Sequence, residues 1–186
     1  MGIHTLRSAC ANRNGWLTTD GAMVCKMHVM RCFVFLLVMW CNTAWAWLGV
    51  VTHVSDGDTV WVQPLQGGEA YKVRLLGIDA PEICQPWGPQ SRAALHAVLH
   101  SQVVDVRART RDSYGRLLAQ LTSQGHDVGA WMVGQGYAWS YSYKHHAGPY
   151  EALQVQAQSQ HLGLFANGRA LQPRWFRKRF GACHLP

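Results

Sequence analysis

The sequence predicts an α+β fold built mainly of β-strands, and two observations lead to this prediction. β-Branched and aromatic residues concentrate in five short runs bounded by Gly- and Asp-rich turns, which is typical of strands. Apolar residues recur at helical spacing after the third run and again after the fifth. The resulting order of three strands, one helix, two strands and two helices is typical of a five-stranded Greek-key barrel with three helices.

The first three strands are expected to be antiparallel neighbours. Residues 48–62 hold two β-branched runs joined by an Asp-Gly-Asp segment at 56–58, which is a hairpin signal. A Gly-Gly pair at 67–68 predicts a second turn. A third strand is expected over residues 71–78, where alternation places one set of side chains on a common face: Val73, Leu75 and Gly77.

The first helix separates this hairpin group from the last two strands. Gly88 and Pro89 provide a cap and a first-turn proline, and apolar residues then recur at helical spacing up to Leu99. Residues 103–109 and 117–121 alternate as strands around a Tyr-Gly-Arg turn.

Two further helices follow. One is expected to start after Asp127, and the other to run from Pro149 to a C-terminal stop at Gly163. The sequence shows neither an internal repeat nor a linker long enough to separate two domains.

Composition narrows the class of protein. The chain has 186 residues, of which 48% are hydrophobic and 15% charged, and this excludes an intrinsically disordered chain. Its formal net charge of +7 favours an anionic partner such as nucleic acid or a membrane surface, although many solvated surfaces are simply basic.

The N-terminal segment has the pattern of a secretory signal peptide. Lys26 and Arg31 flank the start of an uncharged run over residues 32–41, and Ala-Trp-Ala at 44–46 resembles a cleavage site. We therefore expect residues 1–46 to be a signal peptide, with translation starting at an internal Met, and the mature protein to be periplasmic or secreted without stable membrane association. A retained N-terminal membrane anchor is the alternative, because the uncharged stretch continues past Ala46.

Cleavage after Ala46 would leave residues 47–168 as a barrel domain and residues 169–186 as a basic, aromatic tail. Of the six cysteines, only Cys84 and Cys183 would remain. An even number in an oxidising compartment favours a disulfide, which is worth on the order of 4 kcal/mol for a loop of about 100 residues. Two free thiols are the alternative. The tail has two interpretations: a nucleic-acid contact, or an amphipathic end that packs its rings on the barrel.

Three short segments concentrate charge inside otherwise apolar strands. They read Asp-Gly-Asp-Thr at 56–59, Arg-Leu-Leu-Gly-Ile-Asp-Ala-Pro-Glu at 74–82, and Asp-Ser-Tyr-Gly-Arg at 112–116. Alone, Asp-Gly-Asp is more often an ordinary turn than a metal site. Arg74 and Asp79 stand at the two ends of an apolar run, where a guanidinium and a carboxylate usually need each other or a ligand.

In their order and approximate spacing, these motifs resemble those of the staphylococcal nuclease (thermonuclease) family, in its secreted, single-domain bacterial form. The resemblance covers residues 50–167, including Gly-Gln-Gly-Tyr-Ala at 134–138 and Gly-Leu-Phe at 163–165. It implies an OB-fold barrel with three helices. It also implies a calcium-dependent endonuclease that hydrolyses DNA and RNA with little sequence specificity and leaves 3′-phosphates.

By this resemblance, Asp58 and Asp79 are the calcium ligands, the carbonyl of Ala80 is a third oxygen, and Asp56 holds a water in the outer shell. Calcium is a hard cation that takes six to eight oxygen ligands, so carboxylates from two strands together with a carbonyl and waters suit it. The ten histidines show no ligand spacing, which argues against zinc.

The resemblance also assigns the catalytic residues. Arg74 and Arg116 correspond to two arginines that bind the charge on a five-coordinate phosphorus, a task that suits planar guanidiniums. Glu82 corresponds to the glutamate that orients or deprotonates the attacking water. Aromatic rings that stack on bases, at about 1–3 kcal/mol each, are expected at three positions, for which ordinary packing is the alternative: Tyr114, Tyr141 and Tyr143.

The expected partners are therefore DNA and RNA, with single strands favoured, and the protein is expected to be a monomer. The competing function is a non-catalytic OB-fold module that binds nucleic acid, since some relatives keep the barrel and lose the arginines and the glutamate. Retention of Arg74, Glu82 and Arg116 favours the enzyme.

Overall fold

Five strands close into a barrel in the computed structural model of this protein, which describes residues 45–143, 146–181 and 183. These residues belong to one compact unit, Ala44–Pro186. The predicted α+β fold with an OB-type barrel is confirmed. The barrel strands are β1 (Trp45–Val54), β2 (Thr59–Pro64), β3 (Tyr71–Leu75), β5 (Val103–Arg111) and β6 (Leu117–Ser123).

Two kinds of pairing close the barrel. β1 pairs with β2 and β2 with β3 in antiparallel register, as the hairpin signals predicted. β5 lies between β1 and β6 and is antiparallel to both. β3 then pairs with β6 in parallel, with Arg74 opposite Leu118. Side chains that alternate along these strands point inward and are fully buried, which forms the core between the strands: Val51, Val60, Val62, Val73, Val104, Val106 and Leu121.

The predicted third strand over residues 71–78 is wrong in its second half. β3 ends at Leu75, the chain turns at Leu76 and Gly77, and a separate short strand β4 (Ile78–Asp79) pairs with β8 (Trp139–Ser140). Gly77 has a φ of 81°, and a Cβ there would lie 2.6 Å from Pro149 Cγ. The turn therefore needs glycine for its backbone angle and for the close approach of the segment before α4.

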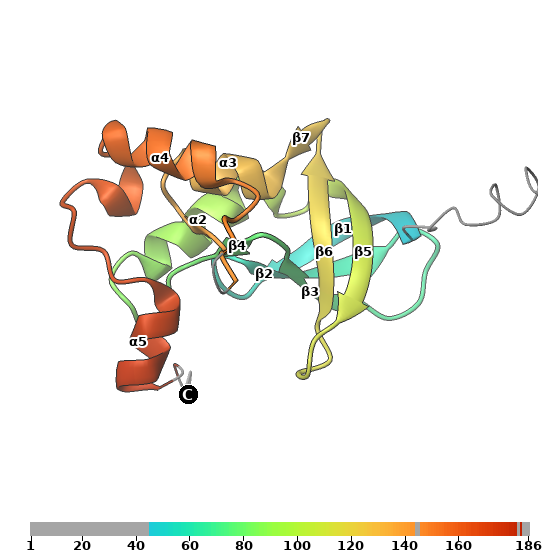
Figure 1. Ribbon diagram of the computed structural model, residues 1–186. Coiled ribbons are helices and arrows are strands. Elements are labelled where there is room, and N and C mark those ends of the chain that lie inside the picture. Colours follow the sequence, from blue (N-terminus) through green and yellow to red (C-terminus); the bar gives the residue numbers. More distant parts are fainter. Residues whose placement is uncertain (1–44, 144–145, 182, 184–186) are drawn as a thin grey trace, which may run out of the picture. The chain divides into compact units, whose positions relative to one another are not determined.

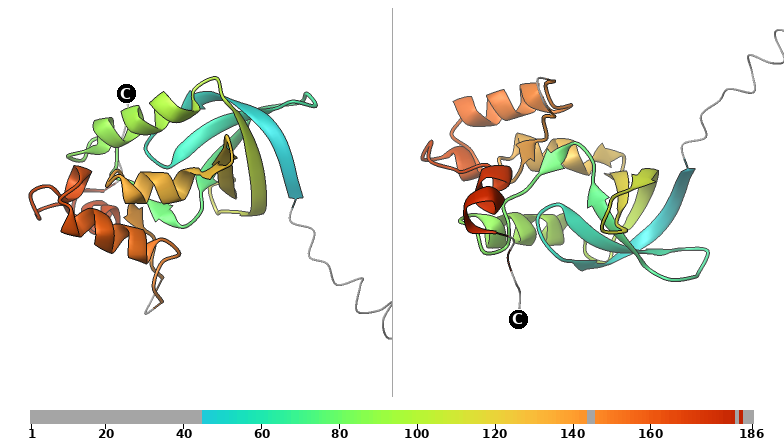
Figure 2. Two further views of the ribbon diagram at one scale, coloured as in Figure 1. Left: turned by 90° about the horizontal axis from the view of Figure 1, so that it is seen from above. Right: turned by 60° about the horizontal axis from the view of Figure 1, so that its bottom comes forward.

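The helices lie to one side of the barrel strands, as Figures 1 and 2 show for α2, α3 and α4. The helix α3 begins where the sequence predicted, because the Asp127 side chain accepts a hydrogen bond from Ala130 N. The predicted stop at Gly163 is too late, since α4 ends at Ser159 and Gly163 opens a short 3₁₀ turn. The bounds are α2 (Gly88–Leu99), α3 (Val128–Gly134), α4 (Glu151–Ser159) and η1 (Gly163–Phe165), with the short strand β7 (His126–Asp127) before α3.

A fourth α-helix of the described residues, α5 (Pro173–Phe180), lies within the predicted tail. The prediction of three helices therefore missed one. The helix begins with a proline and ends with three basic residues in its last turn, which are favourable positions at the two ends of a helix. The rings of Phe176 and Phe180 lie 5.0 Å apart on one side of it.

The predicted signal peptide falls almost entirely outside the described residues, which begin at Trp45. Trp45 and Ala46 are the first residues of β1, where they pair with Ala108 and Arg107. Cleavage after Ala46 would therefore shorten β1 by these two residues. Among the described residues, none of the helices combines the length and apolarity needed to span a bilayer.

Candidate active site

The segments singled out by the sequence line one cleft of about 620 Å³. They come from the β1–β2 turn, the end of β3, the chain after β4, and the β5–β6 turn. Asp79 is not in the lining of this cleft, but it is ion-paired with two residues that are, Arg74 and Arg177. The predicted residues that line the cleft are Asp56, Asp58, Arg74, Ala80, Glu82, Tyr114, Arg116 and Tyr141, whereas Tyr143 is not in its lining.

The β1–β2 turn is fixed by the carboxylates it carries. Asp56 Oδ1 accepts a hydrogen bond of 2.9 Å from Asp58 N, which makes a local Asx-type turn. The buried Asp58 accepts from Thr59 Oγ1 at 3.0 Å and from Ala80 N, also at 3.0 Å. Asp58 thus joins the β1–β2 turn to the chain after β4 and brings two of the three charged segments together.

Arg74 joins the same two segments from the end of β3. One of its terminal nitrogens is ion-paired with Asp58 Oδ1, and Nη2 lies 2.9 Å from Asp79 Oδ1. The side chain of Arg74 is only 17% exposed. Burial alone would lower its pKa, but the charges of Asp58 and Asp79 raise it, so Arg74 stays a cation.

The acids outnumber the cations that neutralise them, and their pKa values reflect this. Burial and the charge of Asp58 raise the pKa of Asp56 to about 7. Burial and the same charge also raise the pKa of Asp79, against the opposing effects of Arg177 and Arg74. Asp58 itself has a lowered pKa, because Arg74 and the Ala80 N–H outweigh the effect of its burial. Such a cluster favours the binding of an additional cation.

The donor set fits a hard divalent cation. Asp58 and Asp79 are buried carboxylates from two different segments, and the chain at Ala80 runs directly beside Asp58. Within the described residues, no group of three or more His, Cys, Asp or Glu side chains is arranged as a metal site. The predicted set contains two carboxylates and one carbonyl, so water and substrate oxygens would have to complete its coordination.

The β5–β6 turn places Arg116 and Tyr114 on the cleft. Asp112 accepts from the backbone N–H groups of Tyr114 and Arg116, at 2.9 and 3.0 Å, and from Arg116 Nε at 2.7 Å. The guanidinium of Arg116 lies 5.4 Å from the ring centroid of Tyr114, which is 83% exposed. Tyr141, which directly follows β8, is also exposed.

Two contacts on Glu82 and its neighbours come from the C-terminal part of the chain. Cys84 and Cys183, which are 99 residues apart in sequence, form the expected disulfide. Arg177 of α5 reaches the same segment, with Nη1 2.6 Å from Glu82 Oε1 and Nη2 3.3 Å from Asp79 Oδ2. Sequence reasoning missed Arg177, because nothing in the basic run at 174–179 distinguishes the cation that turns inward.

Comparison with known proteins identifies the family. Residues 72–167 match the family described as staphylococcal nuclease homologue, a range that ends before α5. The chain is 34% identical over 129 residues to an uncharacterised endonuclease of Haemophilus influenzae, covering 69% of this chain and 72% of that protein. It is 36% identical over 150 residues to protein ParB of Escherichia coli, covering 74% and 84%. A micrococcal nuclease of Shigella flexneri is 34% identical over 149 residues, covering 72% and 83%. This chain belongs to the staphylococcal nuclease family.

Proposed function

We propose that this protein is a calcium-dependent endonuclease that hydrolyses phosphodiester bonds of DNA and RNA and leaves 3′-phosphates. The observation that carries the proposal is the meeting of Arg74, Arg116, Glu82 and Asp58 at one cleft, although they come from three segments that are separate in sequence. A non-catalytic nucleic-acid-binding module has no need for two arginines beside a cluster of buried acids. Relatives named endonuclease and micrococcal nuclease support the same interpretation.

The two arginines carry the electrostatic part of the proposed reaction. Attack on the phosphorus places negative charge on its equatorial oxygens, and guanidiniums at 74 and 116 donate hydrogen bonds to that charge. Arg74 is held before substrate arrives by Asp58 and Asp79, and Arg116 by Asp112. Fixed donors of this kind need little reorganisation as the charge develops.

Glu82 acts on the attacking water. Its carboxylate lines the cleft and accepts the proton of the water, or orients it by a hydrogen bond. The bound calcium ion, held by Asp58, Asp79 and the Ala80 carbonyl with Asp56 behind them, would supply positive charge that polarises a phosphoryl oxygen. These roles divide the site into a cation-binding side and a proton-accepting side.

The substrate is held by aromatic rings and by surface charge. Tyr114 and Tyr141 stand exposed beside the cleft, where bases of any sequence can stack on them, and this favours single strands. On α5, the exposed Arg174, Lys178 and Arg179 present cations to the phosphate backbone. The predicted signal peptide supports a location in the periplasm or outside the cell, where we propose that the protein acts as a monomer.

Incubation of the purified protein with single-stranded DNA and RNA tests the proposal. Cleavage is expected with calcium, is abolished by a chelator and returns when calcium is restored, and end-group analysis is expected to find 3′-phosphates. Binding of both nucleic acids without cleavage would instead favour the non-catalytic module. Cleavage that a chelator leaves unchanged would remove calcium from the mechanism.

A further inference from the structure

The helix α5 reaches into the candidate active site through one residue. Arg177 forms a hydrogen bond of 2.6 Å to Glu82 Oε1 and contacts both carboxylate oxygens of Asp79 at 3.3 to 3.5 Å. Its guanidinium therefore spans a proposed calcium ligand and the proposed proton acceptor. Arg177 lies ten residues beyond the range that matches the family, so the family assignment gives it no role.

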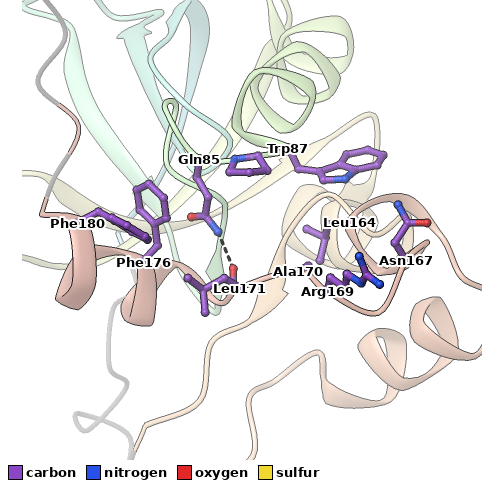
Figure 3. Close-up of a pocket in the computed structure, with 10 residues that line it drawn as sticks. Gln85, Trp87, Leu164, Asn167, Arg169, Ala170, Leu171, Phe176 and Phe180 are labelled. Carbon is purple, nitrogen blue, oxygen red and sulfur yellow. Dashed lines mark hydrogen bonds between the residues drawn. The ribbon is translucent and has the colours of Figure 1, made fainter.

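Both ends of α5 are anchored to the chain just after Glu82. Before the helix, Leu171 O accepts a hydrogen bond of 2.6 Å from Gln85 Nε2, which Figure 3 shows as a dashed line. After the helix, Cys183 is bonded to Cys84. Because the two anchor points, Cys84 and Gln85, are adjacent in sequence, α5 is held against this one segment from both sides.

The buried side chain of Gln85, which binds Leu171, also forms a hydrogen bond with the backbone of Glu82. Its Oε1 accepts a hydrogen bond of 3.2 Å from Glu82 N, while its Nε2 binds Leu171. Gly88 supports the same segment, because a Cβ there would lie 1.9 Å from Glu82 O. The backbone of Glu82 is thus fixed by Gln85 and by the start of α2.

Two aromatic rings of α5 face the segment that follows Glu82 across a cavity (Figure 3). Phe176 and Phe180 line a cavity of about 770 Å³ together with Gln85, Trp87 and Leu171, and Figure 3 shows the two rings beside Gln85. Arg177 follows Phe176 directly, and its guanidinium is placed by its ion pairs with Glu82 and Asp79. Hydrogen bonding to Glu82 and the charge of Asp79 keep the pKa of Arg177 above its usual value against the effect of burial.

We propose that Arg177 is a positioning residue, which holds the Glu82 carboxylate in the orientation that the attacking water requires. The disulfide and the Gln85–Leu171 hydrogen bond hold α5 so that Arg177 can reach Glu82. Side chains must be fixed to within about 1 Å for such work, and a backbone fixed at Glu82 leaves the carboxylate free to rotate unless it has a partner. This inference rests on the proposed function, in which Glu82 acts on water.

The first test compares steady-state cleavage of single-stranded DNA by Arg177→Gln, Arg177→Lys and the control Arg107→Gln, which replaces an exposed arginine on β5. Arg177→Gln is expected to lower kcat about 10- to 100-fold with KM changed less than about twofold. Arg177→Lys should recover part of kcat, and Arg107→Gln should leave it unchanged. A rise in KM at constant kcat would make Arg177 a substrate-binding residue, and unchanged kinetics would remove it from the site.

A second measurement does not depend on cleavage. A double-mutant cycle with Glu82→Gln and Arg177→Gln in urea unfolding is expected to show coupling of at least about threefold in the unfolding equilibrium constant. Additive effects would mean that the two side chains do not interact in solution, which would overturn the proposal. An unchanged kcat in Glu82→Gln would contradict the proposed role of Glu82 in catalysis. Coupling between Glu82 and Arg177 together with a normal kcat in Arg177→Gln would contradict only the positioning role of Arg177.

The anchors are tested with Cys84→Ser combined with Cys183→Ser. Loss of one anchor is expected to lower kcat in the same direction as Arg177→Gln but by less, because Gln85 still holds Leu171. Adding Arg177→Gln to this variant should then lower kcat by a smaller factor than it does in the parent protein. Equal factors in both backgrounds would show that the disulfide does not act through Arg177.

Discussion

Arg74 Nη2 lies 2.9 Å from Asp79 Oδ1, although a full apolar stretch separates the two residues in sequence. The turn at Leu76 and Gly77 makes this contact possible, because it ends β3 and redirects the chain before Asp79. In a continuous strand, residues 74 and 79 would point to opposite faces. The ion pair therefore depends on the glycine, and it keeps Arg74 in the cleft before any phosphate is bound.

Replacing Arg74 by lysine is expected to keep the fold and to lower kcat on the order of a hundredfold or more. Lysine retains the charge but cannot bind two oxygens in a fixed plane, so it loses the preorganised donor. Steady-state kinetics on single-stranded DNA measures the effect, with circular dichroism to check the fold. The matched control is Arg107→Lys, an exposed arginine on β5. Equal activities of the two variants would contradict a catalytic role for Arg74.

The free energy of unfolding of the metal-free protein is expected to fall as the pH rises from about 4 to about 7. Burial and the charge of Asp58 raise the pKa of Asp56 from 3.8 to about 7, so across this range the folded state holds a proton that the unfolded state has released. Folding is therefore favoured at the lower pH, by about 2–4 kcal/mol for this group. The raised pKa of Asp79 acts in the same direction.

Urea unfolding in the presence of a chelator, repeated at several pH values, measures the slope of the unfolding free energy against pH. The variant Asp56→Asn is expected to flatten it, and the matched control Glu151→Gln, at an exposed position on α4, is expected to leave it unchanged. If Asp56→Asn has the slope of the parent protein, Asp56 does not take up a proton on folding in this range.

Removing the ring of Tyr114 is expected to raise KM for single-stranded DNA about fivefold or more, with a smaller effect on kcat. The ring is exposed at the edge of the cleft and is worth about 1–3 kcal/mol if a base stacks on it. Tyr114→Phe serves as the control, because it keeps the aromatic face. A Tyr114→Ala variant with unchanged KM would show that the ring does not contact substrate.

The outer cations of α5 are expected to contribute to the salt dependence of nucleic-acid binding. Removing one cation that binds a phosphate should lower the slope of log K against log salt concentration by about 0.7 for a single strand. Replacing Arg174, Lys178 and Arg179 together by glutamine should therefore lower the slope by about 2. Fluorescence anisotropy at several salt concentrations measures it. An unchanged slope would favour the other interpretation of this segment, an amphipathic end that only packs its rings on the protein.

The barrel and most of its elements could be predicted from the sequence because their signals are local. Alternation of buried valines defines the strands, and Asp127 marks the start of α3 through a side-chain cap. The turn at Gly77 could not be recognised in the same way, since glycine fits an apolar strand pattern. Glycine is needed there in part because Pro149, which is distant in sequence, lies where a Cβ would be.

In the candidate site, too, the residues with local sequence signals could be predicted and those placed by tertiary contacts could not. Its acids and two of its arginines stand in short motifs, so the resemblance to a family located them, and the structure brings most of them to one cleft. Arg177 is one cation among four in the run at 174–179. It is distinguished by its ion pairs with Glu82 and Asp79 and by the anchors at both ends of α5, and these are tertiary contacts.

The parallel pairing of β3 with β6 has a consequence for the order of events during refolding. Arg74 is on β3, and Arg116 directly precedes β6, so the strands that bring them together are distant in sequence and meet where the barrel closes. Strand contacts of such long sequence separation form slowly, because the entropy of closing the intervening loop must be overcome first. A hairpin of β1 and β2 could form earlier without creating any catalytic site. Recovery of cleavage after dilution from denaturant would therefore follow barrel closure, and would lag behind the recovery of local strand structure.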